Sequence, residues 1–200
     1  MQVASFCGSL GSMSANAAAL DVATRRVLET GHDIIAVAGL ESIPPFHPEQ
    51  VDDPAAVVSE FRRSLESCDA VLLSAPEYAG GVAGLTKNAL DWLVGSGSLY
   101  HRTVGVLSAG TTGGAHAIEQ LVRTLSWQGA LVVAVLGIDA PRPKMDERGV
   151  STDDATISAI EAWADKVIAA ANASPSDRTE MVATIVTSYG IDAQRFGTIP

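Results

Sequence analysis

The chain has only two cysteines among its 200 residues, Cys7 and Cys68, too few for the disulfide framework of a small secreted protein. It also lacks any apolar run of about 18 residues, the length that a membrane-spanning helix needs. The N-terminus shows no basic region followed by an apolar stretch, so no secretory signal peptide is expected. These absences favour a cytoplasmic protein with reduced thiols and no membrane partner.

Positive charge is scarce as well, because 13 Lys and Arg stand against 23 Asp and Glu and give a net charge of −10. No basic cluster is present to neutralise a phosphate backbone, which argues against a nucleic-acid partner. The four histidines belong to no ligand pattern, so no metal site is expected. A small anion can still bind an acidic protein, since screening leaves the local donors to decide.

Apolar residues make up 47% of the chain and charged residues 18%, which is typical of a globular protein with a sizeable core. Strand-like and helix-like stretches alternate along it. Residues 118, 121, 122 and 125, for example, form an i, i+3, i+4, i+7 apolar stripe. The Asp-Pro dipeptide at residues 53–54 predicts the start of another helix, with proline at its first position. The five expected strands are residues 2–6, 33–37, 70–75, 103–109 and 130–138.

This (βα)₅ alternation predicts an α/β fold with a doubly wound parallel sheet, in which ligands bind at the carboxyl ends of the strands. We expect one domain over residues 1–173. Residues 174–200 would form a C-terminal tail, with a helix over 176–190 and an extended end over 191–200. The tail serves either as an oligomer contact or as a loosely attached segment.

The stretch "CGSLGSMSAN" (7–16) follows the first expected strand and carries two glycines, three serines, an asparagine and no charge. Its glycines do not fit G-x-G-x-x-G, and it has no lysine for a Walker A loop. Hydroxyl groups and free N–H groups at a helix N-terminus suit a terminal phosphate. Plain helix capping by serine or asparagine explains the same residues, and the stretch alone leaves both interpretations open.

The stretch "PEYAGGVAGLTKNALDW" (76–92) follows the third expected strand and resembles the P-E-Y-x-x-x-x-P-G-x-x-K-N-x-x-D-W signature of the NADPH-dependent FMN reductase family. That family includes flavodoxin-like quinone, chromate and azo-dye reductases. "GSLGSMSAN" is similar to its phosphate loop G-S-x-R-x-x-S-x-N, and "SAGTTGG" (108–114) to its glycine-rich segment after the fourth strand. The resemblance covers residues 2–170.

The resemblance implies a flavodoxin-like three-layer α/β/α fold with strand order 2-1-3-4-5, bound FMN, and NADPH or NADH as co-substrate. It also implies a homodimer or homotetramer with FMN near an interface. The implied phosphate-binding residues are Ser9, Leu10, Gly11, Met13, Ser14, Ala15 and Asn16. Those implied for the isoalloxazine ring are Pro76, Glu77, Tyr78, Ala79, Gly80 and Gly81, with Ser108, Ala109, Gly110, Thr111, Gly113 and Gly114 at its other edge.

The chain departs from the family pattern at three positions. Gly11 stands where the family has arginine, Ala79 where it has asparagine, and Ala83 where it has proline. Loss of a well-paired arginine removes about 1.5–3 kcal/mol of charge-assisted contact, although a helix N-terminus still suits a dianion. The double substitution S14A/N16A is predicted to weaken FMN binding at least tenfold, or about 1.4 kcal/mol.

Five further residues have a functional and a structural interpretation or lie near the expected pocket. Tyr78 is the candidate for ring contact, while Glu77 is expected to make a structural hydrogen bond or salt bridge rather than act as a general acid. Trp92 belongs either to a subunit interface or to the core. His101 and His116 are candidates for the pocket rim.

No catalytic side chain is identified, because the resemblance implies that bound flavin performs the chemistry. The expected function is an FMN-dependent NAD(P)H oxidoreductase that works by a ping-pong cycle. Quinones, azo dyes, free flavin and metal oxyanions are its possible acceptors. Two alternatives stay open: a flavodoxin-type electron carrier without its own reductase activity, and a non-enzymatic binding or regulatory protein on the same fold.

Overall fold

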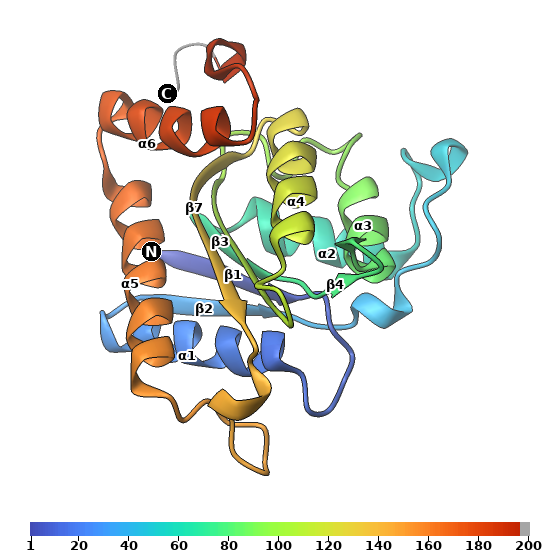
Figure 1. Ribbon diagram of the computed structural model, residues 1–200. Coiled ribbons are helices and arrows are strands. Elements are labelled where there is room, and N and C mark those ends of the chain that lie inside the picture. The colour runs from blue at the N-terminus through green and yellow to red at the C-terminus, as the bar shows by residue number, and fades with distance from the viewer. Residues whose placement is uncertain (197–200) are drawn as a thin grey trace.

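Five parallel strands form one sheet in the order β2-β1-β3-β6-β7, which is the predicted 2-1-3-4-5 order of the main strands (Figure 1). The structure is a computed structural model that describes residues 1–196. Each strand lies within one residue of its expected range at either end. The strands are β1 (Gln2–Cys7), β2 (Asp33–Val37), β3 (Ala70–Ser74), β6 (Thr103–Gly110) and β7 (Leu131–Asp139).

The middle of the sheet is buried on both faces. All five residues of β3 are buried, as the continuous apolar run of that stretch predicts. A separate antiparallel hairpin of β4 (Glu77–Tyr78) and β5 (Gly81–Val82) projects beyond the end of β3. Six α-helices are described: α1 (Ala15–Glu29), α2 (Ala56–Glu66), α3 (Gly84–Asp91), α4 (Ala115–Trp127), α5 (Asp154–Asn172) and α6 (Pro175–Ser188).

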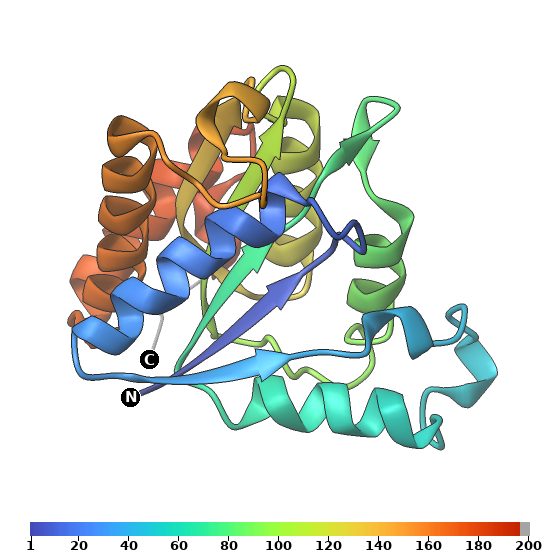
Figure 2. The same cartoon turned by 90° about the horizontal axis from the view of Figure 1, so that it is seen from below.

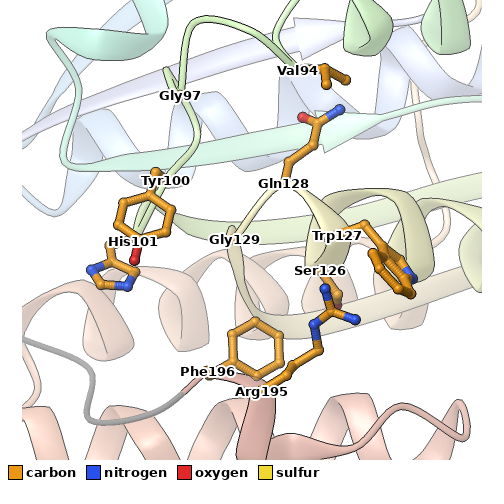
Figure 3. Close-up of a pocket in the computed structure, with 10 residues that line it drawn as sticks. All are labelled: Val94, Gly97, Tyr100, His101, Ser126, Trp127, Gln128, Gly129, Arg195 and Phe196. Atoms are coloured by element: carbon orange, nitrogen blue, oxygen red, sulfur yellow. The ribbon is translucent and has the colours of Figure 1, made fainter.

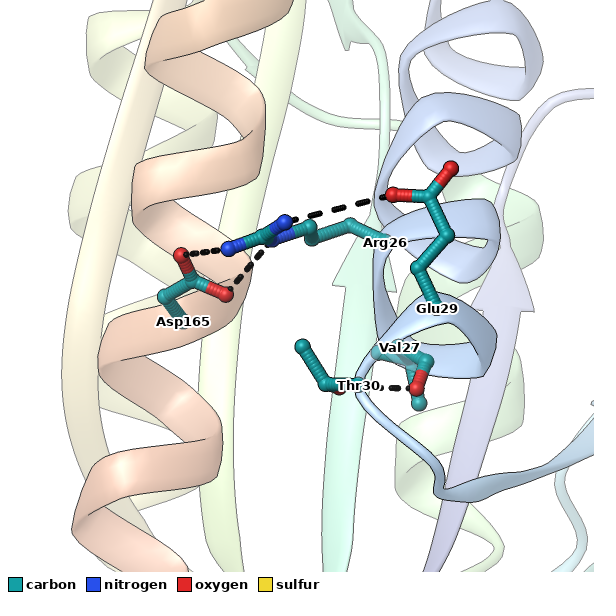
Figure 4. Close-up of polar contacts among 5 residues, drawn as sticks. All are labelled: Arg26, Val27, Glu29, Thr30 and Asp165. Carbon is teal, nitrogen blue, oxygen red and sulfur yellow. Dashed lines mark hydrogen bonds and ion pairs between the residues drawn. The ribbon is translucent and has the colours of Figure 1, made fainter.

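The helices cover both faces of the sheet, which makes the predicted three-layer arrangement. Helices α1 and α5 pack side by side on one face, and α2, α3 and α4 lie on the other (Figures 1 and 2). Arg26 of α1 donates two hydrogen bonds of 2.9 Å to the Asp165 carboxylate of α5, which joins the two helices (Figure 4). On the opposite face, the rings of Phe6 and Phe61 meet edge to face.

The start of α2 is a correction to the sequence analysis. The helix begins at Ala56, two residues after Pro54, because Ala55 keeps an extended backbone with ψ of 150° and serves as the N-cap. No side chain caps this end of α2. The Asp-Pro pair therefore belongs to the preceding loop.

The tail contains the predicted extra helix, α6, and joins the core of the rest of the chain. Val182 and Val186 are fully buried, and α6 packs against β7 and α5. The expected extended end is wrong for residues 193–196, which form a short 3₁₀ helix that buries Phe196 against the same core. Residues 197–200 lie outside the described part of the chain. No helix within residues 1–196 combines the length and the apolar character needed to cross a membrane.

Candidate functional site

Three loops gather at the carboxyl edge of the sheet, where a parallel α/β fold places its ligands. They are the β1–α1 loop (8–14), the segment from the end of β3 through the hairpin (75–83) and the β6–α4 loop (111–114) (Figure 2). All three come from the stretches that the sequence analysis singled out. The structure therefore brings the three predicted segments to one edge.

Asn16 ties these segments together from beneath. Its Nδ2 donates to the Ala109 carbonyl at 2.9 Å, and its Oδ1 accepts from the Ala109 N–H at 2.9 Å and from Ser74 Oγ at 3.1 Å. Only 3% of Asn16 is exposed. Its carboxamide thus holds the ends of β3 and β6 against α1. Because all these hydrogen bonds occupy the carboxamide, the side chain of Asn16 is not positioned to bind a phosphate. Its backbone N–H lies in the first turn of α1 and remains available to a ligand.

The β1–α1 loop offers a row of hydrogen-bond donors. Ser14 is the N-cap of α1, and its Oγ accepts from the Ala17 N–H at 3.2 Å. A hydroxyl that accepts can still donate, so Ser14 remains available to an anion. The hydroxyls of Ser9 and Ser12, which make no hydrogen bond with any residue that the structure describes, are available as well. Within residues 1–196, no hydrogen bond is made by the N–H groups of Ser9, Leu10, Gly11, Ser12, Met13, Ala15 and Asn16.

The second helix N-terminus at this edge is already occupied. Glu77 Oε2 accepts from the N–H groups of His116 and Ala117, at 2.9 and 3.2 Å, in the first turn of α4. The carboxylate satisfies this positive helix end, which agrees with the structural role expected for Glu77. Of the two helix ends, α1 is therefore the one whose N–H groups remain for an anionic ligand.

The β4–β5 hairpin presents Tyr78 to solvent, with 62% of the residue exposed. Its turn is formed by Ala79 and Gly80, with φ of 52° and 72°. Gly80 thus needs the conformational freedom of glycine, whereas Gly81 has no positive φ and is required for space. A Cβ on Gly81 would lie 3.0 Å from Oε1 of Gln120, the atom that accepts the Val82 N–H.

Replacing Ala79 by asparagine is expected to stabilise the protein by about 0.5 kcal/mol. Alanine in the left-handed region costs about 1–2 kcal/mol, whereas the short polar side chain of asparagine can hydrogen-bond to the nearby backbone and offset part of that cost. Replacing it by valine should destabilise the protein, since β-branched residues avoid positive φ. Thermal unfolding followed by circular dichroism measures both. Equal melting temperatures for A79N and A79V would contradict the assignment of strain to this residue.

The β6–α4 segment contributes mostly backbone to the site. Ser108 is buried and donates from Oγ to the Ala75 carbonyl at 2.7 Å, while both backbone groups of Ala109 are taken by Asn16. Gly113 and Gly114 adopt positive φ and let the chain turn into α4. Thr111 is exposed beside them. The segment therefore borders the site mainly with backbone atoms rather than with side chains.

Two of the candidate residues lie elsewhere or serve the fold. His101 precedes β6 at the amino end of the sheet, where it stacks on Tyr100 in a cavity of about 330 Å³ (Figure 3). It is therefore remote from the three loops, and its placement at the pocket rim is wrong for this site. Trp92 is 0% exposed and donates from Nε1 to the Pro44 carbonyl at 2.8 Å, so the core interpretation holds.

Cys7 lies beside the β1–α1 loop without being an activated nucleophile. Burial raises the pKa of its thiol, and a backbone contact with Ser9 lowers it by less than burial raises it. The thiol therefore stays protonated at neutral pH.

Comparison with known proteins matches residues 1–138 to the model of the NADPH-dependent FMN reductase family. The chain belongs to this family. An NAD(P)H-dependent FMN reductase of Pseudomonas aeruginosa is 37% identical over 94 residues, which are 46% of this chain and 49% of that protein. An NAD(P)H:quinone oxidoreductase of Solanum tuberosum is 27% identical over 179 residues, which are 81% of this chain and 88% of that protein.

Among solved structures, the FerB flavoenzyme, an NAD(P)H:(acceptor) oxidoreductase of Paracoccus denitrificans, shares the fold with a TM-score of 0.69. The two chains are 23% identical, and the match covers 84% of this chain and 97% of FerB. The match with the Pseudomonas reductase spans only about half of that protein's length. Family membership implies an oxidoreductase with FMN as cofactor and NAD(P)H as co-substrate.

The residues at this edge of the sheet fit the chemistry of FMN. The helix end of α1 has unpaired N–H groups and hydroxyls, and the loop of residues 8–14 contains no carboxylate to repel a phosphate. Leu10 and Tyr78 are large exposed apolar side chains, 64% and 62% exposed, on two of the three loops, and such side chains suit a flat aromatic ring.

The sequence analysis missed the residues that hold these loops in place. Ser74 and Gln120 lie far along the chain from the groups that they bond, and neither belongs to a motif. Arg148, which lies beside Ser12 and Ser14, was missed for the same reason. No local signal in the sequence marks such partners.

Proposed function

We propose that this chain is an FMN-dependent NAD(P)H oxidoreductase that reduces quinones by a ping-pong cycle at one open site. The observation that carries the proposal is the free helix end of α1, framed by hydroxyl groups, beside an α4 end that Glu77 already fills. The match to the potato quinone oxidoreductase over most of both chains supports a quinone acceptor. Azo dyes, free flavin and metal oxyanions are further acceptors to test.

The protein's part in this mechanism is binding and orientation. The N–H groups of residues 9–13 and the hydroxyls of Ser9 and Ser14 would hold the phosphate, and the hairpin would place Tyr78 against the ring. When bound there, FMN would supply the redox chemistry, namely acceptance of a hydride from NAD(P)H and transfer of two electrons to the acceptor. The loops would fix the two reactants in turn, and solvent at the open site would supply the proton that accompanies the hydride in the reduction of a quinone.

The purified protein tests this proposal after incubation with excess FMN and removal of free flavin. A yellow protein that oxidises NAD(P)H when a quinone is added supports it. A protein that binds FMN but oxidises no NAD(P)H would be a flavodoxin-type carrier. A protein that binds no FMN would be a non-enzymatic member of the fold.

We also propose that the protein is a homodimer or homotetramer. We place it in the cytoplasm, a compartment that keeps thiols reduced, and its two cysteines are free. A candidate contact face includes Val94, Tyr100 and Trp127, which are 62–68% exposed large apolar residues around two neighbouring cavities. Light scattering after gel filtration measures the mass. A single species of 20.7 kDa would contradict self-association.

A further inference from the structure

A tight turn between β7 and α5 lies against the β1–α1 loop. Residues Met145 and Ser151 pair across it, and Asp146 Oδ1 accepts the N–H groups of Arg148 and Val150 at 2.9 Å each. These hydrogen bonds lower the pKa of the Asp146 carboxyl, so it is ionised at neutral pH and holds the turn in one conformation.

The turn touches the loop at its tip. A Cβ added to Gly149 would lie 3.3 Å from Met13 Sδ and 3.7 Å from the Met13 Cα, so the two backbones run close together. Both views place this segment beside the N-terminal end of α1 (Figures 1 and 2). The residue before Gly149 is Arg148, which lines a cavity together with Ser12 and Ser14 of the loop.

A cavity of about 170 Å³ separates the turn from α1. Its polar lining consists of Ser12 and Ser14 of the loop, Asp21 and Arg25 of α1, and Arg148 and Ser151 of the turn. The residues that line the cavity carry two guanidinium groups, three hydroxyls and one carboxylate. Such a lining suits an anion with several acceptor oxygens.

Arg148 is the better placed of the two cations. Arg25 lies eleven residues after the N-cap, about 16 Å along the helix axis, and its Nε donates to the Asp21 carbonyl at 3.3 Å. Arg148 is 85% exposed on its side chain, and its closest partner is the Asp146 carboxylate at 3.4 Å from Nε. Its terminal nitrogens make no hydrogen bond within residues 1–196, so they remain available to a ligand.

The loop of residues 8–14 has no positive side chain of its own. A phosphate monoester carries a charge of about −1.5 to −2 at neutral pH, while a helix end offers about half a positive charge. We propose that Arg148 completes the phosphate site from the neighbouring turn and makes the protein select FMN over riboflavin. This inference rests on the proposed function, in which the α1 end holds the FMN phosphate.

The test compares flavin-free wild type with R148Q, R148K and R142Q by quenching of flavin fluorescence. R142Q is the matched control, because Arg142 is an exposed cation of the same connection that does not line the cavity. We expect R148Q to raise the Kd for FMN at least tenfold and to leave the Kd for riboflavin unchanged. R148K should recover part of the loss, since it restores the charge but not the planar fork. R142Q should bind both flavins like the wild type.

Other outcomes overturn the proposal in distinguishable ways. Equal weakening of FMN and riboflavin in R148Q would assign Arg148 a structural role, and an unchanged FMN affinity would exclude the contact while the proposed function stands. The 2′-phosphate of NADPH is the other source of the same chemistry. A raised KM for NADPH but not NADH, with unchanged FMN affinity, would move the contact to the co-substrate. A wild type that binds neither flavin would refute the proposed function itself.

Discussion

Replacing Asn16 by alanine is expected to lower the free energy of unfolding by about 3 kcal/mol, which corresponds to a fall in melting temperature of roughly 6–12 °C. The substitution removes three buried hydrogen bonds at once and leaves the Ala109 N–H, the Ala109 carbonyl and the Ser74 hydroxyl without their partner. Each buried polar group left unpaired costs about 1–3 kcal/mol, and a water molecule in the vacated space offsets part of that.

Ser14→Ala is the matched control, because Ser14 lies in the same turn but makes one capping bond at a partly exposed site. It should cost about 1 kcal/mol, the usual loss for an N-cap serine. Urea and thermal unfolding of the flavin-free protein give both values. If N16A unfolds within 2 °C of the wild type, the Asn16 carboxamide is not a structural tie and is free to serve a ligand.

Ser14 and Asn16, which the double substitution S14A/N16A changes together, have different roles in the structure. The predicted tenfold loss of FMN affinity in S14A/N16A would mix a direct contact with a folding defect. In the structure, Ser14 keeps a hydroxyl that can donate to a phosphate, whereas Asn16 supports the loop from below. S14A alone is therefore the informative variant for binding, and N16A is informative for stability.

The positions of the strands could be predicted from the sequence because each is a continuous apolar run bounded by polar or turn residues. Strand β3, for example, is buried on both faces and reads as an uninterrupted apolar stretch. Parallel topology then fixes which loops meet at one edge, so the sequence suffices to place the three candidate segments together.

The destinations of side chains at this edge could not be predicted, because they depend on contacts between distant parts of the chain. Asn16 bonds a residue 93 positions away, and Glu77 caps a helix 39 positions away. The positive φ of Ala79 was missed for a different reason: alanine carries no local preference for that conformation. A motif in the sequence can therefore indicate which loop binds a ligand, but only the folded structure shows which polar atoms of that loop lack a hydrogen-bond partner within the protein.

Replacing Gly114 by alanine is expected to cost about 3 kcal/mol of stability and to weaken FMN binding. Gly114 is the N-cap of α4, with φ of 66°, and a Cβ there would lie 2.0 Å from Ser108 Oγ and 2.4 Å from Ser108 Cβ. Rotation of the serine moves Oγ but not Cβ, and β6 is held in the middle of the sheet. The start of α4 must therefore move outward, at about 1–3 kcal/mol for overpacking and about 1–2 kcal/mol for the backbone conformation.

That movement would spread to the site through two contacts. Glu77 bonds the first turn of α4, and Gln120 of the same helix holds Val82, so the hairpin with Tyr78 would shift with the helix. Gly80→Ala is the matched control, because Gly80 has φ of 72° but no heavy atom within 4 Å of the added Cβ. It should cost about 1 kcal/mol from the backbone conformation alone.

The difference between the two alanine variants isolates the contact with Ser108. A second variant, S108G/G114A, removes the atom that the new methyl group would strike, although it also loses the bond from Ser108 to the Ala75 carbonyl. Thermal unfolding and FMN titration of G114A, G80A, S108G and S108G/G114A should rank G114A as the least stable, and the double variant should lose less stability than the sum of the losses in S108G and G114A. Equal losses in G114A and G80A would mean that α4 and β6 are not in close contact, and the link from α4 to the hairpin would then carry no strain to the site.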